Sequence, residues 1–414
     1  MDSSLKNIPV GWNVKLSSEV LFFQEGPGVR KWQFKKEGVK LLNGGNINNN
    51  TINLSSTKNY LSEDEVYSKY KHFLIDEGDL LIACSGITVN TFYKKIAFVR
   101  SKDLPLCLNT STMRFKSLAD IELRYFYYYL QTNYFTKQIQ RLITGSAQLN
   151  FGPSHMRKIE VLLPPLDQQK KIAAILDAAD GYRQKTKALI EKHDTLTQSL
   201  FIDMFGDPVR NPKGWEVNFL EQVTTKIGSG ATPRGGKQAY KKEGISLIRS
   251  MNVYDYRFKY KNLAFIDQNQ AAKLKNVIVE KGDVLFNITG ASICRSSVVP
   301  NNVLPARVNQ HVSILRPITS IITSKFLSRF LISENVKTKL LGVGSGGGAV
   351  MEAITKGQLQ KIEVIIPPLE LQNQFSKKVQ AIEAQKARAQ ASLEQAEDLF
   401  NSLLQRAFKG ELTD

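Results

Sequence analysis

Cysteine and long apolar stretches are both scarce in this chain. The three cysteines, Cys84, Cys107 and Cys294, lie far apart and form no CxxC pair. This excludes a disulfide scaffold and a cysteine-based zinc site, and it suits a reducing cytoplasm. No apolar run reaches the ~18 residues that a membrane span needs, so a transmembrane protein is excluded. Residues 1–12 contain no apolar stretch of the kind found in a secretory signal.

The common catalytic motifs are also missing. Base-directed amino-methyltransferases need Asn or Asp before a Pro-Pro pair and an aromatic residue after it, but the pairs at 164–165 and 367–368 have aliphatic neighbours on both sides. There is no GxxxxGK[ST] loop and no GxSxG turn, and the four histidines show neither HExxH nor paired metal spacing. The sequence therefore predicts a non-catalytic chain that holds no metal or cofactor of its own.

Two aspartates occupy matching places before apolar runs, in Gly78-Asp79-Leu80-Leu81 and Gly282-Asp283-Val284-Leu285. A pair of carboxylates for metal-dependent cleavage is one interpretation, but it needs further acidic partners nearby. A Gly-Asp turn that leads into a strand explains both positions better.

An internal repeat organises the chain. Five short segments recur in the same order at offsets of 199 to 204 residues. They are Pro9-Val10-Gly11-Trp12 with Pro212-Lys213-Gly214-Trp215, the two Gly-Asp segments, Gly145-Ser146 with Gly344-Ser345, 158–166 with 361–369, and Ser199-Leu200 and Phe205 with Ser402-Leu403 and Phe408. Five pairs in register indicate two copies of one unit.

Each copy divides into two parts of different character. Residues 1–163 and 209–366 are rich in β-branched residues, aromatics and turn residues. They predict strands at 79–83, 95–99, 244–249 and 284–288 and helical stretches near 119–143 and 323–340. The aromatic run Tyr125–Tyr129 on the first stretch is better explained as a buried face with two tyrosines at its rim than as a base-stacking surface.

Residues 164–208 and 367–414 each predict one long helix, because a Pro-Pro pair precedes the helix and no proline interrupts 168–205. Apolar residues recur at spacings of three and four, which favours an intramolecular coiled coil over one side of an ordinary bundle. The predicted seam contains Ile172, Ile175, Ala179, Tyr182, Thr186, Leu189, His193, Leu196 and Leu200 in the first helix and Phe375, Val379, Ile382, Lys386, Ala389, Leu393, Ala396, Phe400 and Leu403 in the second. The fold class is α+β, with two tandem domains joined by two long antiparallel helices.

The surplus positive charge lies on the two predicted domains. The chain has a formal net charge of +18, of which residues 1–163 carry +7 and residues 209–366 carry +13. The two helical parts, 164–208 and 367–414, carry −1 each. Two basic lobes on nearly neutral helices suit an elongated anion such as duplex DNA, contacted at two places.

Polar and basic loops supply the candidate DNA contacts. In 228–237 glycines, hydroxyls and two cations share one loop, which either donates hydrogen bonds to phosphates and base edges or is a surface turn with incidental charges. The loops of the first lobe differ in composition, as expected if the lobes recognise different sequences. The candidates are Arg30, Lys31, Gln33, Asn46, Asn48, Ser85, Lys94 and Lys95 in the first lobe, and Ser229, Thr232, Arg234, Lys237, Arg249, Ser250, Asn252, Arg257, Asn287, Thr289 and Arg295 in the second.

The order and duplication of these motifs resemble the DNA-specificity (S) subunits of Type I restriction–modification enzymes. The resemblance rests on the Pro-x-Gly-Trp segments, Gly228–Pro233, Val308–His311, the Lys-Ile-x-Val-x-x-Pro-Pro-Leu segments and Leu166–Asp177. It implies two target-recognition domains that direct partner subunits to a bipartite asymmetric site on double-stranded DNA. It also implies DNA adenine methyltransferase (M) subunits, two in number, and restriction (R) subunits as partners, with S-adenosylmethionine and ATP bound on those chains.

Two other functions are compatible with parts of the pattern. A coiled-coil scaffold with basic lobes could bind RNA or an acidic protein, although no RNA-type aromatic sheet motif is present. A self-sufficient modification enzyme is disfavoured by the missing methyltransferase motifs.

Overall fold

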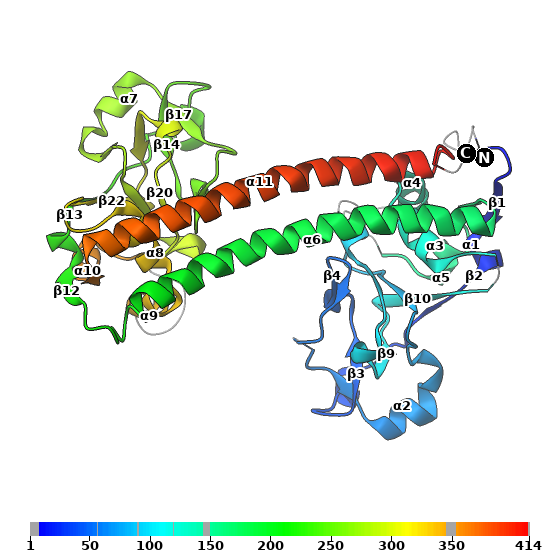
Figure 1. The fold of residues 1–414 in the computed structure, drawn as a ribbon. Coiled ribbons are helices and arrows are strands. Elements are labelled where there is room, and N and C mark those ends of the chain that lie inside the picture. The colour runs from blue at the N-terminus through cyan, green and yellow to red at the C-terminus, as the bar shows by residue number, and fades with distance from the viewer. Residues whose placement is uncertain are drawn as a thin grey trace. The chain divides into compact units, whose positions relative to one another are not determined.

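The computed structural model describes residues 8–55, 57–88, 91–118, 120–143, 150–344 and 353–412. The predicted repeat residues Gly145, Ser146 and Ser345 lie outside these ranges. The chain forms two compact units, Met1–Lys185 with Leu393–Asp414 (unit 1) and Thr186–Ser392 (unit 2). Each unit contains one lobe and a half of each long helix (Figure 1). Among the described residues, no helix combines the length and the hydropathy that a membrane span requires.

Unit 1 is an α+β lobe whose main sheet has the strand order β2-β10-β7-β8. A three-stranded sheet β6-β3-β9 and the pairs β1-β11 and β4-β5 complete it. Its elements are β1 (Asn13–Leu16), α1 (Ser17–Val20), β2 (Leu21–Glu25), β3 (Val39–Leu42), β4 (Ile47–Asn48), β5 (Thr51–Ile52), β6 (Tyr60–Leu61), α2 (Glu63–Lys69), β7 (Leu80–Ala83), β8 (Ile96–Phe98), β9 (Leu106–Leu108), β10 (Thr112–Ser117), α3 (Leu123–Tyr129), α4 (Asn133–Leu142), α5 (Pro153–Met156) and β11 (Glu160–Leu163).

Unit 2 repeats this plan, with β13-β22-β19-β20 as its main sheet and β17-β14-β21-β18 as the second. The pairs β12-β23 and β15-β16 match β1-β11 and β4-β5 of unit 1. Its elements are β12 (Glu216–Phe219), β13 (Thr224–Ser229), β14 (Ile245–Ile248), β15 (Val253–Tyr254), β16 (Arg257–Phe258), β17 (Ala264–Ile266), α7 (Gln268–Ala272), β18 (Ile278–Val279), β19 (Val284–Asn287), β20 (Ser296–Val298), β21 (Ala306–Val308), β22 (Val312–Pro317), α8 (Ser324–Ile332), α9 (Glu334–Gly344), α10 (Lys356–Gln360) and β23 (Glu363–Ile366).

The helical stretches predicted near 119–143 and 323–340 are each two helices rather than one. α3 and α4 are separated at Thr132, whose hydroxyl accepts a hydrogen bond from the backbone N of Phe135 and so begins α4. α8 ends at Ile332, and α9 begins two residues later. Both stretches are helical as predicted, but the break inside 119–143 could not be predicted, because the Thr132 cap restarts the helix without any proline or glycine to mark it. The aromatic run of α3 is fully buried, so the core interpretation is confirmed but the predicted rim tyrosines are absent from 125–129.

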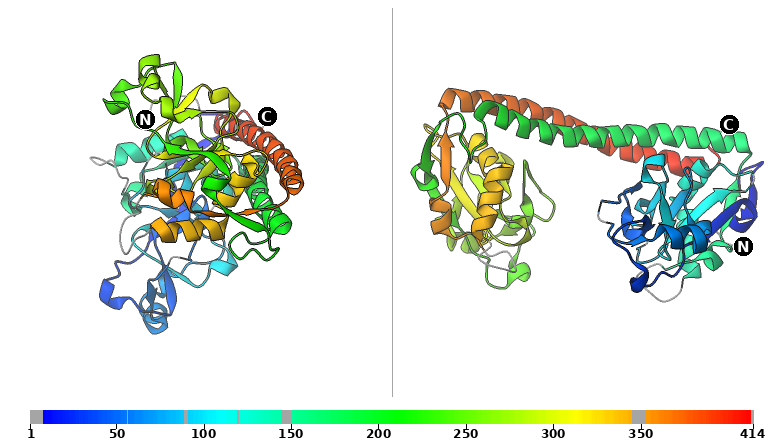
Figure 2. Two further views of the ribbon diagram at one scale, coloured as in Figure 1. Left: turned by 90° about the vertical axis from the view of Figure 1, so that its left-hand side faces the viewer. Right: turned by 90° about the horizontal axis from the view of Figure 1, so that it is seen from below.

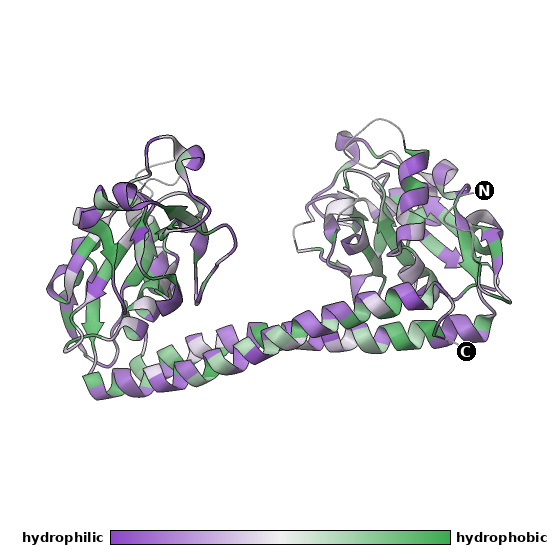
Figure 3. Cartoon of the chain, turned by 90° about the horizontal axis from the view of Figure 1, so that it is seen from above, coloured by the Kyte–Doolittle hydropathy of each residue, from purple (hydrophilic) through white to green (hydrophobic). Residues whose placement is uncertain are grey.

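The two long helices are α6 (Leu166–Phe205) and α11 (Leu369–Ala407), and they pack together side by side (Figure 2). In unit 1, Ile172 and Leu176 of α6 share one core with Phe400 and Ala407 of α11. In unit 2, Phe201 and Phe205 of α6 share a core with α11. Figure 3 shows that hydrophobic residues concentrate on the inner strands of each lobe, while the helices present hydrophilic residues along much of their length.

The seam of α6 differs from its prediction at Tyr182, Leu189 and Leu196, which are 54%, 46% and 51% exposed. The predicted Thr186 and His193 are buried, and so is Thr197, which the prediction did not include. Polar atoms of the last two are satisfied within the helix: His193 Nδ1 lies 2.7 Å from the Leu189 carbonyl O, and Thr197 Oγ1 donates to the His193 carbonyl O at 3.0 Å. Burial of such side chains is therefore possible. Among the other predicted seam residues, Ile172, Phe375, Val379, Ala389, Leu393, Ala396 and Phe400 are buried, while Ile175, Ala179, Leu200, Ile382, Lys386 and Leu403 are half-buried.

Candidate nucleic-acid interface

Each unit has an equivalent two-stranded hairpin that lies beside its main sheet. In unit 2 it consists of β15 and β16, and in unit 1 of β4 and β5. A buried asparagine fixes each hairpin: Asn252 Nδ2 donates to the Lys259 carbonyl O at 2.9 Å, and Asn46 Nδ2 donates to the Asn53 carbonyl O at 3.0 Å. Each asparagine also accepts a backbone N–H three residues earlier, from Arg249 or Asn43. Because Asn252 and Asn46 make the same bonds, the two hairpins can be matched residue by residue. Tyr254 of unit 2 then occupies the position of Asn48 in unit 1, and Arg257 occupies that of Thr51.

The strand that follows in the main sheet brings one more cation to each hairpin. Arg295 precedes β20, and its guanidinium carbon lies 4.5 Å from the centre of the Tyr254 ring. Lys95 precedes β8, and its Nζ donates to Asn48 Oδ1 at 2.6 Å. Arg295 and Lys95 occupy equivalent positions, because each accepts the same main-chain hydrogen bond. The backbone N of Asn287 donates to the Arg295 carbonyl O at 2.9 Å, and the backbone N of Ala83 donates to the Lys95 carbonyl O at 2.9 Å.

Other candidates of unit 2 lie in the loops around this hairpin. Asn287 is buried and its Nδ2 donates to the Ser250 carbonyl O at 2.9 Å. Arg249 lies 5.1 Å from the Tyr240 ring centre, and its buried Nε has no hydrogen-bond partner among the described residues. Thr289 Oγ1 lies 2.5 Å from His311 Nδ1.

The glycine-rich loop 228–237 begins at the end of β13. Gly230 is required there, because a Cβ at this position would lie 1.8 Å from the Val308 carbonyl O. Thr232 Oγ1 donates to Gln310 Oε1 at 2.5 Å, which ties this loop to the turn before β22. Ser229, Arg234 and Lys237 are exposed. The loop is fixed at Gly230 and exposes a hydroxyl and two cations. These features are compatible with a DNA-contact loop and also with a surface turn that carries incidental charges.

The remaining candidates of unit 1 are more scattered. Arg30, Lys31, Ser85 and Lys94 are exposed, and Ser85 Oγ donates to Asn150 Oδ1 at 2.9 Å. Gln33 is buried and its Nε2 donates to the Tyr70 hydroxyl at 3.0 Å, so it serves the packing of the loop.

Four candidates of the two lobes have buried side chains: Gln33, Asn46, Asn252 and Asn287. The amide groups of Gln33, Asn46 and Asn252 bond to neighbouring backbone or side-chain atoms and so shape the loops. The Asn287 Nδ2 is bonded in the same way, but its buried Oδ1 has no hydrogen-bond partner among the described residues. Sequence reasoning did not select Tyr254, Tyr240 or Lys259 as individual site residues. Aromatic and basic residues alternate across 254–261, and this pattern is the sequence signal for Tyr254 and Lys259.

The two Gly-Asp segments are structural turns. Asp283 accepts the backbone N–H of Glu280 at 2.7 Å, and its carboxylate binds the Arg316 guanidinium at 2.8 and 3.0 Å. Asp79 accepts the backbone N–H of Asp76 at 3.0 Å and lies 3.4 Å from Arg114. The turn interpretation therefore explains both aspartates. Across the described parts of the chain, no group of three or more His, Cys, Asp or Glu residues could hold a metal ion.

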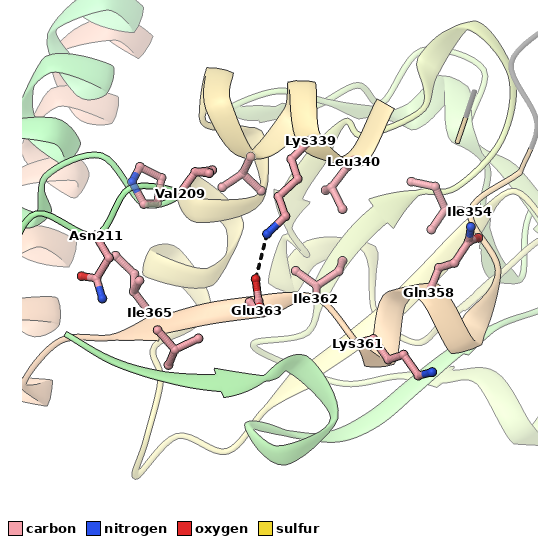
Figure 4. Close-up of a pocket in the computed structure, with 13 residues that line it drawn as sticks. Val209, Asn211, Lys339, Leu340, Ile354, Gln358, Lys361, Ile362, Glu363 and Ile365 are labelled. Atoms are coloured by element: carbon pink, nitrogen blue, oxygen red, sulfur yellow. Dashed lines mark hydrogen bonds and ion pairs between the residues drawn. The ribbon is translucent and has the colours of Figure 1, made fainter. Parts of the chain in front are cut away.

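A pocket of about 340 Å³ lies at the base of unit 2 between α9, α10 and β23 (Figure 4). Its walls are mostly aliphatic, with Val336, Leu340, Ile354, Ile362 and Ile365 among them. The single ion pair drawn there joins Lys339 Nζ to Glu363 Oε2 at 2.7 Å, and both side chains are more than half exposed. The lining is therefore chiefly apolar, with Lys339, Lys361 and Glu363 as its charged residues.

Known proteins share both the sequence pattern and the fold. The family model of the Type I restriction modification DNA specificity domain matches residues 9–192 and 212–397. The putative Type I restriction enzyme MjaX specificity subunit of Methanocaldococcus jannaschii is 24% identical over 92% of this chain and 89% of its own length. The MjaVIII specificity subunit of the same organism is 28% identical over 46% of this chain, and the chain spans only 45% of that relative.

Solved structures agree on the fold. The S subunit of a Type I restriction-modification system from M. genitalium has a TM-score of 0.55 at 15% identity and covers 97% of both chains. A chain from a structural study of Type I complex assembly and conformational transition has a TM-score of 0.56 at 19% identity and covers 98% of this chain and 99% of its own. With the family model matching both repeats, this chain belongs to the Type I restriction–modification DNA specificity family, as a non-catalytic specificity subunit that determines DNA target recognition.

Proposed function

We propose that the chain recognises a bipartite, asymmetric sequence in double-stranded DNA, with one half of the site contacted by each lobe. The observation that carries this proposal is the pair of equivalent hairpins, which share their buried asparagine and differ in the side chains they expose. A common frame with different polar groups is what two recognition domains need if each contacts its own half-site.

The proposal extends to the assembly and to the domain boundaries. Residues 1–163 and 209–366 are the target-recognition domains, and 164–208 and 367–414 are helical spacers that also bind the partner chains. Those partners are two DNA adenine methyltransferase subunits and restriction subunits, which bind S-adenosylmethionine and ATP. The complex acts in the cytoplasm.

Exposed candidates carry the DNA contacts in this proposal, and buried ones set loop shape. The exposed or half-buried set comprises Arg30, Lys31, Asn48, Ser85, Lys94 and Lys95 in unit 1 and Ser229, Thr232, Arg234, Lys237, Arg249, Ser250, Arg257, Thr289 and Arg295 in unit 2. The cations among them have stems long enough to contact phosphates, and the hydroxyl and amide groups can bond to base edges.

Exchanging one lobe tests the proposal. The chain is co-expressed with its methyltransferase partner, and methylated adenines are mapped across a genome. Replacement of residues 209–366 by the corresponding lobe of another family member is expected to change one half of the methylated sequence and to leave the other half intact. The reciprocal exchange of residues 1–163 should change only the other half. Methylation without a defined sequence, or a change in both halves after a single exchange, would overturn the proposal.

A further inference from the structure

Three cations surround one tyrosine on the hairpin of unit 2. Measured to the centre of the Tyr254 ring, the guanidinium carbons of Arg295 and Arg257 lie at 4.5 and 5.2 Å, and Lys259 Nζ lies at 5.2 Å. Cations over the face of an aromatic ring are attracted by its quadrupole, which holds three like charges close together. Tyr254, Arg257, Lys259 and Arg295 together form the Tyr254 cluster.

The cluster is positive and uncompensated. None of its three cations forms an ion pair with a carboxylate in the part of the chain that the structure describes, and the neighbouring Asp255 is already paired with Lys337 at 2.9 Å. Arg257 and Lys259 are exposed, and Arg295 and Tyr254 are half-buried. The nearby Lys259 lowers the pKa of the Tyr254 hydroxyl through its hydrogen bond and its charge, which is consistent with a strongly positive environment. The three positive charges around one ring repel one another, and the binding of an anion would relieve this repulsion.

The turn of the hairpin is fixed on its opposite side. Asp255 Oδ1 accepts the backbone N–H of Ser296 at 3.2 Å, and the ring centre of Tyr256 lies 4.2 Å from the guanidinium carbon of Arg329. Arg329 is buried, and its Nη2 binds Glu383 Oε1 of α11 at 2.7 Å. The hairpin is thus connected to the helix within unit 2, so the cluster is held in place before any ligand arrives. A preorganised charged site loses less entropy on binding.

The equivalent positions of unit 1 carry much less charge. Asn48, Thr51 and Asn53 stand where unit 2 has Tyr254, Arg257 and Lys259, and Lys95 is the single cation. Lys95 is bonded to Asn48 instead of being one of three cations around a ring. Unit 1 therefore offers amide and hydroxyl groups at the place where unit 2 offers positive charge.

We propose that the Tyr254 cluster is a phosphate clamp that holds the DNA backbone at the half-site of unit 2, while the matching hairpin of unit 1 makes polar contacts and no comparable clamp. The inference rests on the proposed function, because DNA is taken as the ligand. In this proposal the three cations of the cluster increase the affinity for DNA and fix the position of the lobe along the duplex, but they do not select bases. Arginine and lysine grouped without acidic partners bind phosphate oxygens by charge-assisted hydrogen bonds.

Salt dependence tests the clamp. The full-length chain is titrated with a duplex that carries the methylated sequence and with a scrambled duplex of equal length. Binding is expected to fall with salt less steeply in a triple variant with Arg257→Gln, Lys259→Gln and Arg295→Gln, by about 0.9 in the log–log slope for each phosphate that the variant no longer neutralises. For three phosphates, the wild-type affinity should fall about 40-fold more than that of the variant between about 50 and 200 mM salt.

The control variant removes the same charge elsewhere in unit 2. Lys356→Gln, Lys361→Gln and Lys378→Gln replace exposed residues on or near α10 and α11. The slope of this control should stay within about 0.9 of the wild-type slope, the value for a single phosphate. The single change Lys259→Gln, at an exposed position, repeats the test with a smaller expected slope change if the triple variant is poorly folded.

The outcomes separate the clamp from the proposed function. A triple variant with a reduced slope and an unchanged methylated sequence supports the clamp. A slope no different from that of the control, or a new base preference in the half-site of unit 2, overturns the clamp while sequence-specific binding by the wild type stands. A wild-type chain that binds both duplexes equally overturns the proposed function itself.

Discussion

Replacing Phe205 by alanine is expected to destabilise unit 2 by about 3–5 kcal/mol, the range for removal of a buried aromatic ring. Phe205 is the last residue of α6 and is fully buried. Its ring centre lies 4.7 Å from that of Phe326 on α8 and 5.2 Å from that of Phe375 on α11. One ring thus joins the lobe to both long helices within this unit, and a cavity at this point would weaken the packing of all three.

Chemical denaturation combined with hydrogen exchange measures the effect and locates it. The increase in exchange should be confined to residues of unit 2. Leu196→Ala is the matched control on the same helix, because Leu196 is half exposed and its truncation should cost less than about 1 kcal/mol. Phe408→Ala is the counterpart in unit 1, where this ring lies 5.1 Å from the Tyr125 ring centre. Equal losses of stability from Phe205→Ala and Leu196→Ala would show that the helix seam contains the predicted leucines after all.

Asp283→Ala should destabilise unit 2 by about 3 kcal/mol. The change removes the acceptor for the Glu280 backbone N–H and leaves Arg316 with one carboxylate fewer, in a setting where the Asp283 side chain is fully buried. The free energy of unfolding from urea titrations provides the measurement. Glu363→Ala breaks an ion pair whose side chains are both more than half exposed, and it should cost less than about 1 kcal/mol. Similar values for the two variants would contradict the structural role given to Asp283.

The matching aspartate of unit 1, Asp79, gives a prediction for the pH dependence of stability. Burial raises the pKa of Asp79 above its ordinary value of 3.8, although Lys116 and Arg114 oppose the shift. An acid with a raised folded pKa binds more protons in the folded state, so its contribution to stability falls as the pH rises from 3.8 through the folded value. The penalty of Asp79→Asn should therefore be largest in acid and shrink toward neutral pH, as urea titrations across this range would measure. A penalty that grows with pH would show that the ion pairs outweigh burial.

The repeat, the four strands and the two long helices could be predicted because their signals are local and doubled. The predicted strand at 284–288, for example, appears as β19 (Val284–Asn287). The α6 seam could not be predicted in full, because hydrophobicity favours leucine at positions 189 and 196. The heptad spacing predicts the burial of Thr186 and His193, but the burial of Thr197 depends on its hydrogen bond to a carbonyl group one turn earlier, which composition does not reveal.

The candidate site could likewise be predicted only in part from the sequence. The cations of the Tyr254 cluster lie in the segments that sequence favoured, but Arg295 is 41 residues from Tyr254 and meets it only through the pairing of strands. The polar character of Asn46 and Asn252 suggested ligand contacts. In the structure both amides are used by the backbone, because a tight hairpin leaves carbonyl and N–H groups that need partners.

Those two buried asparagines have a consequence for how such chains diversify. Each fixes the hairpin through main-chain atoms at both ends and makes no demand on the side chains that the hairpin exposes. Substitutions on the outer face can accumulate or be exchanged as a block without disturbing the lobe that carries them. Over evolution, these few positions can therefore change the charge that each hairpin presents to a ligand while the inherited architecture is kept.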